Sequence, residues 1–389
     1  MRITRNALHL SLALLATVSL SACDFGEQPY ETEEGENLSI RGPSEAAVPN
    51  GTATFNIFPF TIDKNYEWSV EGPGDPSFER RRSGEFIDVS FDQPGSYTVT
   101  VDDGEYTGET TLTASYPDIV DQAGRFGFGR LGTALGTAGL ADTLGTDGPF
   151  TVFAPTDAAF VSALDTTDDG SLNLPAASVL SDILAYHVVP DSLGAGALGS
   201  SQETLEGGAL MFETPGGDVQ VIDGSDATGP ATVTNANVPA ANGFIHAIDA
   251  LRLPPTASVA FNDQTSEGGV TINMRSVYVP EDGYVAIHDS TLLDDPPQVA
   301  GSVIGVSEYL EAGVYNDLEI TLFDVPGKDF DDDMVLEGDQ LLIAMPHEET
   351  NMNEEYNFLT SGGTEDGAYT EGGDPVVDPA AVAVGGGEQ

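Results

Sequence analysis

The stretch that decides the fold of the middle of this chain is GPFTVFAPTDAAF, residues 148–160. Its first half is rich in β-branched and aromatic residues, which is typical of a buried strand. Pro155, Thr156 and Asp157 follow as a turn, in which Thr156 or Asp157 can cap the first turn of a helix. The stretch therefore predicts a strand that leads directly into a helix.

Two further blocks follow at a distance. They are ILAYHVVPD, residues 183–191, and NGFIHAIDALRLPP, residues 242–255. In this order and at this spacing, the three blocks resemble the fasciclin (FAS1) domain, an extracellular adhesion and matrix module. The resemblance covers residues 116–255 and implies a mixed α+β fold. The resemblance indicates the type of domain but does not identify a ligand.

The hydrophobic spacing within residues 116–255 agrees with that mixed fold. Leu131, Ala134, Leu135 and Ala138 recur at helical intervals, and Gly139 suits the end of the helix. A second helix is predicted where Leu180, Ile183, Leu184 and His187 share one face. Strands are predicted at residues 219–222, 231–235 and 244–250.

The candidate contact residues come from the family resemblance. In fasciclin domains a Tyr-His pair, here Tyr186 and His187, has been linked to adhesion. Asp182 precedes it, in a run where some animal relatives carry integrin-recognition residues. Against this interpretation, the helical spacing places His187 on the apolar face. We favour buried, hydrogen-bonded core positions for His187 and for His246.

The flanking regions have the composition of β-domains. Residues 38–115 contain strand candidates at 52–58, 86–91 and 96–101 and the single Trp68, which we expect in the core, and they resemble an Ig-like or PKD-like sandwich. Residues 256–380 contain strand candidates at 270–279, 284–288, 318–323 and 340–344. The runs GYVAIHDS, GSVIGVSEYLEAG and LLIAMPHEETN resemble an uncharacterised β-sandwich domain of halophile secreted proteins. Residues 381–389 are expected to form a disordered tail.

The first residues have the composition of an export signal. Arg2 and Arg5 precede an apolar segment that is too short for a comfortable bilayer span. The segment ends in Leu20-Ser21-Ala22-Cys23, which resembles a bacterial lipobox, and Cys23 is the only cysteine. We therefore expect a lipoprotein signal peptide at residues 1–22, lipidation of Cys23 and an acidic tether at residues 23–37. The anchor would hold the protein on the extracytoplasmic side of a bacterial membrane.

The charge balance is extreme, with 64 Asp and Glu against 12 Lys and Arg and a formal net charge of −52. Self-repulsion of this size opposes a compact state in dilute buffer. At about 1 M salt the Debye length is only ~3 Å, so most of the repulsion is screened. Because the acids are spread over every region, we favour adaptation to brine over specific cation binding. Nucleic acid is excluded as a partner, because no basic face is present to meet phosphates.

Catalytic and metal motifs are absent from the sequence. There is no G-x-S-x-G elbow and no phosphate-binding glycine loop, and the sole cysteine belongs to the lipobox. His347 begins a run like a zinc-protease helix, but Asn351 stands where the second histidine is required. Acidic runs at 165–170, 329–333 and 351–355 could offer oxygens to Ca²⁺, although we expect solvated loops with weak binding at most. We therefore expect no catalytic residues, no cofactor and no tight metal site.

The sequence as a whole predicts a multidomain protein: an all-β Ig-like sandwich, an α+β fasciclin domain and a second all-β sandwich. The expected function is adhesion or envelope organisation, with surface proteins or polysaccharides as partners. Two alternatives stay open, namely an envelope-bound protein that binds a glycan or small molecule, and a passive spacer. A pocket lined by aromatic residues would favour the first alternative.

Overall fold

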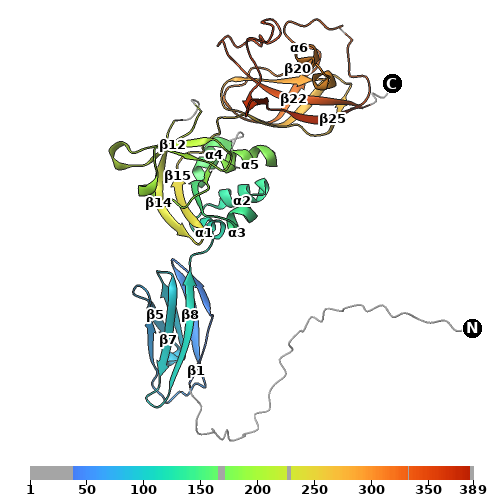
Figure 1. Ribbon diagram of the computed structural model, residues 1–389. Coiled ribbons are helices and arrows are strands. Elements are labelled where there is room, and N and C mark those ends of the chain that lie inside the picture. The colour runs from blue at the N-terminus through green and yellow to red at the C-terminus, as the bar shows by residue number, and fades with distance from the viewer. Residues whose placement is uncertain (1–37, 165–170, 226–228, 332, 386–389) are drawn as a thin grey trace, which may run out of the picture.

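The computed structural model describes residues 38–164, 171–225, 229–331 and 333–385. Three regions follow one another along the chain: a β-region, a mixed region and a second β-region (Figure 1). The predicted signal peptide, Cys23 and the tether lie outside the described residues. Within the described part, no helix is long and apolar enough to cross a membrane.

The N-terminal region consists of two four-stranded sheets that share one core. The first sheet has the order β1 (Ser39–Arg41), β3 (Gly51–Phe58), β6 (Phe86–Phe91) and β5 (Ser77–Arg81). The second has the order β2 (Glu45–Ala47), β8 (Thr107–Ser115), β7 (Gly95–Asp102) and β4 (Glu67–Glu71). Alternate side chains of β7 are buried, as expected for a strand with one face on the core. Trp68 is buried in this core, and its indole N–H donates to the Gly84 carbonyl at 2.9 Å.

The middle region combines one seven-stranded sheet with five helices. Its strands lie in the order β10 (Val188–Val189), β9 (Phe150–Pro155), β15 (Gly243–Ile248), β14 (Ala231–Ala240), β13 (Gln220–Ile222), β12 (Ala209–Glu213) and β11 (Ser201–Glu203). The helices are α1 (Ile119–Arg125), α2 (Gly129–Ala138), α3 (Ala141–Thr146), α4 (Asp157–Leu164) and α5 (Ala177–Ala185). In Figure 1 the helices lie together on one side of β15, and their apolar residues share a core with β9 and β15.

The predicted strand-to-helix stretch and both predicted helices are confirmed, although α5 ends at Ala185 and His187 lies beyond it. β9 is entirely buried and runs into α4, where the Thr156 hydroxyl accepts from the Ala159 N–H at 3.2 Å as a helix cap. α2 buries Leu131, Ala134 and Leu135, and Gly139 ends it in the left-handed conformation with φ 73°. The hydrophobic periodicity therefore corresponds to the face that packs on the sheet.

The C-terminal region consists of two sheets of unequal size. The smaller has the order β16 (Ser258–Ala260), β18 (Thr271–Val279) and β21 (Gly313–Thr321). The larger has the order β17 (Gln264–Glu267), β25 (Asp378–Gly385), β22 (Gln340–Glu348), β19 (Gly283–His288) and β20 (Val303–Val306). The short helix α6 (Val299–Ser302) and the hairpin of β23 (Thr370–Glu371) and β24 (Asp374–Pro375) lie outside these sheets. Single 3₁₀ turns occur at η1 (Arg82–Gly84), η2 (Ala195–Ala197), η3 (Pro215–Gly217) and η4 (Ser290–Leu293).

One detail of the C-terminal region corrects a sequence prediction. β25 continues to Gly385 and pairs with both β22 and β17, so the tail predicted from residue 381 begins too early. The small residues of β25 fit a place between two neighbouring strands, although their low hydrophobicity did not predict a strand. His347 and Glu348, which begin the incomplete zinc-protease motif, belong to strand β22.

The middle and C-terminal regions are joined by shared core and by hydrogen bonds. Ala260 and Tyr278 of the C-terminal region belong to the same apolar core as the helices of the middle region. The Ala176 N–H donates to the Ser276 hydroxyl at 2.7 Å, and the Tyr278 hydroxyl donates to the Pro254 carbonyl at 2.6 Å. Because these contacts are buried and directional, the two regions pack as a single unit.

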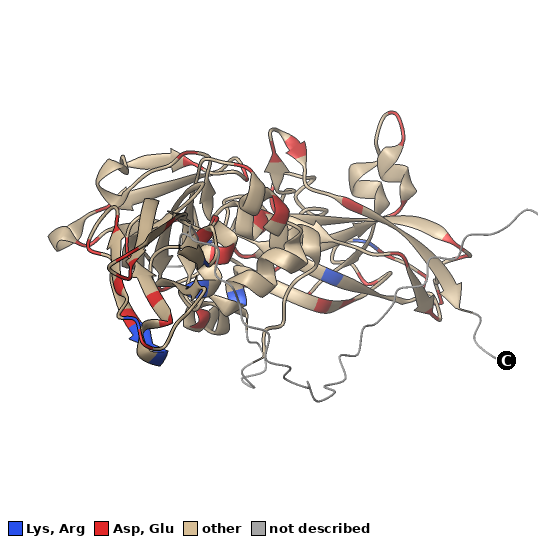
Figure 2. Cartoon of the chain, turned by 90° about the horizontal axis from the view of Figure 1, so that it is seen from below, with Lys and Arg blue, Asp and Glu red and all other residues tan. Residues whose placement is uncertain are grey.

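Acidic residues cover all three regions. In Figure 2 Asp and Glu are scattered over the sheets, helices and loops, whereas Lys and Arg are few. Because acidic residues far outnumber basic ones, Lys and Arg are too few to pair with most of the acidic side chains.

Candidate functional site

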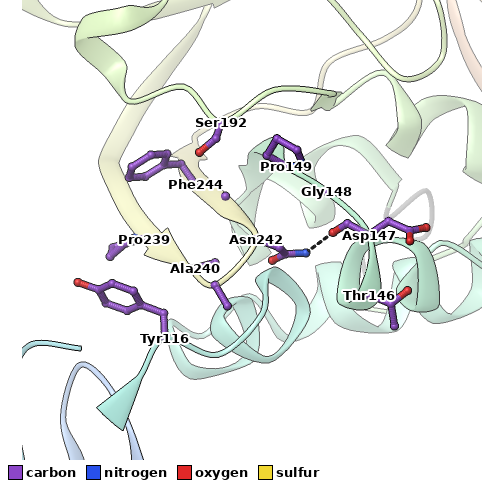
Figure 3. Close-up of a pocket in the computed structure, with 12 residues that line it drawn as sticks. Tyr116, Thr146, Asp147, Gly148, Pro149, Ser192, Pro239, Ala240, Asn242 and Phe244 are labelled. Atoms are coloured by element: carbon purple, nitrogen blue, oxygen red, sulfur yellow. Dashed lines mark hydrogen bonds between the residues drawn. The ribbon is translucent and has the colours of Figure 1, made fainter. Parts of the chain in front are cut away.

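A pocket lies at the end of the sheet of the middle region, where the first and third sequence blocks meet. It has a volume of about 520 Å³. The first block contributes Gly148 and Pro149, the second ends beside Ser192, and the third contributes Asn242, Gly243 and Phe244. In Figure 3 the rings of Tyr116 and Phe244 and the ring of Pro149 surround this hollow. The first and third family blocks therefore form part of the domain surface as well as part of its core.

Asn242 holds the floor of this pocket together. Its side-chain amide donates to the Leu144 carbonyl at 2.8 Å and to the Asp147 carbonyl at 2.7 Å. Its side-chain oxygen accepts from the Ile119 N–H at 3.0 Å. The single side chain thus joins the ends of α1 and α3 to the turn before β15, and its polar atoms are occupied by the protein.

Gly243 is required by close backbone contact. It has φ 152°, and a Cβ atom placed on it would lie 1.7 Å from the Phe150 carbonyl oxygen. No side chain can be accommodated there, because β15 and β9 run parallel at this point and exchange backbone hydrogen bonds. The Asn-Gly pair of the third block is therefore explained by the architecture of the pocket.

The lining of the pocket combines polar groups with ring side chains. Asp147 supplies the one carboxylate among the lining residues, and Tyr116, Pro149, Pro239 and Phe244 supply rings. The arrangement suits a small polar or sugar-like group held against aromatic faces.

Tyr186 and His187, the predicted contact residues, lie away from this pocket and are buried. Tyr186 is 0% exposed, and its hydroxyl donates to the Ala209 carbonyl at 2.8 Å. His187 is 1% exposed; its Nδ1 bonds the Ile183 carbonyl at 2.7 Å, and its Nε2 accepts from the Arg252 N–H at 2.9 Å. Burial lowers the pKa of His187 to about 4 and raises the pKa of Tyr186 to about 12. Both side chains therefore order the core, and neither is accessible to a partner.

Asp182 faces the C-terminal region. Its carboxylate accepts a hydrogen bond from the Ser258 hydroxyl at the start of β16. Burial raises the pKa of Asp182, and the Ser258 hydrogen bond opposes that rise. The helix α5 thus directs its only acidic side chain toward the junction between regions.

A buried ion pair near His187 was not anticipated from the sequence. The Arg252 guanidinium lies 3.4 Å from the Asp223 carboxylate, and both side chains are almost completely inaccessible. Arg252 also donates to the Gly229 carbonyl at 2.8 Å, and Asp223 accepts from the Leu253 N–H at 3.0 Å. The sequence offers one indication of this ion pair. Basic residues are rare in this chain, so an arginine such as Arg252 has many acidic residues with which it can pair.

The remaining candidate positions have structural contacts. His246 accepts from the Asn237 N–H at 3.1 Å and bonds the Leu193 carbonyl at 2.9 Å. The acidic run 165–170 lies outside the described residues, and the run 329–333 is described in part. In the run 351–355 the Asn351 and Asn353 amides bond the Asn357 side chain. Among the residues that the structure describes, no cluster of three or more His, Cys, Asp or Glu side chains could hold a metal ion.

Family models match two of the three regions. Residues 127–254 match the fasciclin domain, and residues 257–383 match a domain of unknown function (DUF7282). The first match covers all of the pocket lining except Tyr116. The second begins directly after the boundary at Pro255.

Known proteins share the fasciclin part of the chain. Cell surface glycoprotein 2 of Haloarcula hispanica is 40% identical over 129 residues, which are 33% of this chain and 12% of that protein. Protein sll1483 of Synechocystis sp. is 40% identical over 169 residues, which are 41% of this chain and 89% of that protein. A solved FAS1 domain pair from the insect cell adhesion molecule Fasciclin I aligns over 53% of this chain and 71% of that chain, with 14% identity and a TM-score of 0.29. The matched domain and the near-complete cover of the Synechocystis relative show that the chain belongs to the fasciclin family.

Proposed function

We propose that the protein is a lipid-anchored cell-surface module that mediates adhesion or organises the envelope through its fasciclin domain. The observation that carries this proposal is the assembly of the three family blocks into one domain with an open pocket at its end. The 40% identity to a protein named cell surface glycoprotein supports the location. The chain spans 12% of that glycoprotein, so the likeness concerns one module of a larger protein.

The anchor and the salt adaptation belong to the same proposal. Cys23 at the end of an apolar segment supports lipidation, and a net charge of −52 supports adaptation to brine. Within such an envelope the partners would be surface proteins or polysaccharides. The proposal includes no catalytic activity, because the pocket lacks a pair of groups that could exchange protons with a substrate.

The pocket can be tested separately from the rest of the domain. Ala241 is exposed at its rim, and its backbone N–H bonds the Pro117 carbonyl, so a long side chain there should fill the hollow without disturbing the fold. Fluorescently labelled protein would be added to native envelopes in brine, as wild type and as Ala241→Arg. Ala158→Arg is the matched control, because Ala158 is exposed on α4 and does not line the pocket. We expect Ala241→Arg to reduce binding at least tenfold and Ala158→Arg to leave it unchanged; equal binding by both variants would exclude the pocket as the contact site.

A glycan-binding role is a second candidate, because the C-terminal region has a pocket lined by aromatic residues. It has a volume of about 430 Å³, and Tyr284, Tyr309 and Tyr356 contribute to its walls. Tyrosine rings stack on sugar faces, and neighbouring carboxylates such as Glu354 can accept hydroxyl hydrogens. Retention of the protein on envelope polysaccharide, with loss of retention on Tyr309→Ala, would favour this role; unchanged retention by the variant would exclude the pocket.

A further inference from the structure

The four histidines of the described residues fall into two kinds. His187 and His246 each use both ring nitrogens in hydrogen bonds. His288 and His347, both in the C-terminal region and both 0% exposed, use only Nδ1. Their Nε2 atoms are buried without a hydrogen-bond partner. Since burial of an unpaired polar atom costs about 1–3 kcal/mol, two such atoms in one place require an explanation.

The hydrogen bonds fix which nitrogen carries the proton. His347 Nδ1 lies 2.6 Å from the Asp366 carbonyl, which can only accept, so Nδ1 carries the hydrogen. His288 Nδ1 lies 2.8 Å from the Ser302 hydroxyl, which itself donates to the Val299 carbonyl at 2.9 Å. The Ser302 oxygen therefore accepts from His288. With the hydrogen on Nδ1, the Nε2 of each neutral ring carries none. Each Nε2 thus presents a lone pair to the protein interior.

The strand register brings these two rings together beside a methionine. Tyr284 pairs with His347, Ala286 with Met345 and His288 with Ile343, so all six residues share one face of β19 and β22. Met345 is buried, next to His347 along β22 and diagonal to His288 across the pair. The two histidine ring centroids lie 6.0 Å apart.

Tyr356 completes the cluster. Its ring centroid lies 5.5 Å from that of His347, and its hydroxyl is also buried without a partner. Three of the five unpartnered buried polar atoms in the described residues are therefore on the neighbouring side chains His288, His347 and Tyr356. Histidines that bind metals typically donate a hydrogen bond from one ring nitrogen, which fixes the ring, and leave the other nitrogen available as a ligand. Nδ1 and Nε2 of His288 and His347 have this arrangement.

The ligand set selects the kind of ion. Ca²⁺ and Mg²⁺ require several oxygens, and structural Zn²⁺ is almost always held by four ligands, but no cluster of three His, Cys, Asp or Glu exists in the described part of the chain. Imidazole and thioether together suit Cu(I), a soft ion. With metal–nitrogen bonds of about 2 Å on each side, two imidazole centroids would be separated by roughly 6 Å, which is the spacing found here.

We propose that His288 and His347 bind one Cu(I) ion through their Nε2 atoms, with the Met345 thioether as an additional ligand. All of these ligands are neutral, so a monovalent ion keeps the buried charge low. The tyrosine pocket lies next to this site, because Tyr356 lies in its wall and its ring packs against that of His347. This binding site is independent of the fasciclin domain and of its pocket.

Competition with bicinchoninate under anaerobic conditions measures Cu(I) affinity. The chain carrying Cys23→Ser would be studied in sodium sulfate brine, with Ag(I) as a redox-inert second probe, because the Cys23 thiol would itself bind these soft ions and chloride would remove silver. We expect one equivalent of Cu(I) and a rise in thermal unfolding temperature on binding. His288→Asn and His347→Asn remove Nε2 while offering an amide donor to Ser302 and Asp366, and each should weaken Cu(I) binding at least 100-fold.

Met345→Leu tests the thioether against a matched control. Met274 is also buried in the C-terminal region, but it belongs to the core between the two sheets. Met345→Leu should weaken binding about tenfold, and Met274→Leu should leave it unchanged. Absence of Cu(I) binding, or binding that both histidine variants retain, would overturn the proposal. Should a variant fail to fold, ¹⁵N shifts of the wild-type histidines decide: Ag(I) must move the Nε2 signals of His288 and His347 and leave those of His187 and His246 unchanged.

Discussion

The Asp182 carboxylate, on the helix that leads into the Tyr186-His187 pair, accepts a hydrogen bond from the Ser258 hydroxyl in the first strand of the next region. The residues that the family resemblance marks for contact are thus turned toward the inside of the molecule. Asp182 connects the fasciclin domain to the C-terminal region. His187 accepts a hydrogen bond from the Arg252 N–H near the end of the domain, and the Tyr186 hydroxyl donates to the Ala209 carbonyl.

Replacement of Asp182 by Asn tests this junction. Burial raises the pKa of Asp182 in the folded state, so its contribution to stability is greatest below the unfolded pKa of about 3.9 and is lost as the pH rises through the folded pKa. Asp182→Asn keeps an acceptor for Ser258 and removes the buried charge. We therefore expect the variant to be at least as stable as wild type at pH 7, as measured by urea unfolding. Ser258→Ala should instead lose about 1 kcal/mol; a clear loss in Asp182→Asn would contradict this account of the junction.

Gly243→Ala tests the backbone contact at the pocket. The added Cβ would meet the Phe150 carbonyl oxygen at 1.7 Å, and the φ of 152° is unfavourable for any side chain. We expect a loss of at least about 2 kcal/mol in unfolding free energy. Gly196→Ala is the control, because a Cβ there meets nothing within 4 Å, and its effect should stay within about 1 kcal/mol. Similar unfolding curves for both variants would show that β15 and β9 are less tightly paired than described.

The buried histidines predict an acid-sensitive fold. Burial lowers the pKa of His187 and His347 to about 4 and of His288 to about 3, against 6.5 when solvated. Between pH 6.5 and 4 the unfolded chain therefore binds protons at these histidines that the folded chain does not bind. The contribution of the neutral histidines to folding stability is fully present above pH 6.5 and is lost as the pH falls toward 4. Urea midpoints measured from pH 7 downward should decrease. His288→Asn should flatten this decrease by up to about 1.4 kcal/mol per pH unit, and an unchanged slope would mean that His288 is protonated in the folded state.

Cys23→Ser tests the anchor. Lipidation requires the thiol, so the variant expressed in its native host should move from the membrane fraction to the soluble fraction. The measurement is a comparison of both fractions by immunoblot after washing in brine. Ser21→Thr, which keeps the cysteine, is the control and should remain with the membrane. A Cys23→Ser protein that still pellets with membranes would refute the lipobox interpretation.

Dilution of salt tests the interpretation of the charge. At about 0.05 M salt the Debye length exceeds ~10 Å, so repulsion among the carboxylates of Figure 2 is no longer screened. We expect the far-ultraviolet circular dichroism to lose intensity on dilution from brine and to recover when salt is restored. A spectrum that stays constant across the same dilution would argue against brine adaptation.

Periodic and contiguous patterns made much of the fold predictable. Leu131, Ala134 and Leu135 mark the buried face of α2, and the alternation around Val99 marks β7, because each pattern follows from local geometry. The short helices α1 and α3 carry too few apolar residues to show a period. Strand β25 was missed because its Ala-rich interior resembles a polar tail in hydrophobicity.

The sites were less predictable because they depend on segments far apart in the sequence. Asn242 reaches the ends of α1 and α3, and no spacing rule connects those positions. His288 and His347 come together only through the register of β19 and β22. The family resemblance directed attention to Tyr186 and His187, and the spacing of His187 after Leu180, Ile183 and Leu184 already indicated its burial.

Adhesion by isolated protein in brine is the most direct test of the central claim. Beads carrying the mature chain through its N-terminus would be mixed with native cells or envelopes in high salt, beside bare beads and beads carrying an acidic protein of similar charge. The fraction of attached beads is counted after washing. We predict attachment by the beads that carry this protein well above both controls. Equal attachment by all three kinds of bead would contradict the proposed adhesive function.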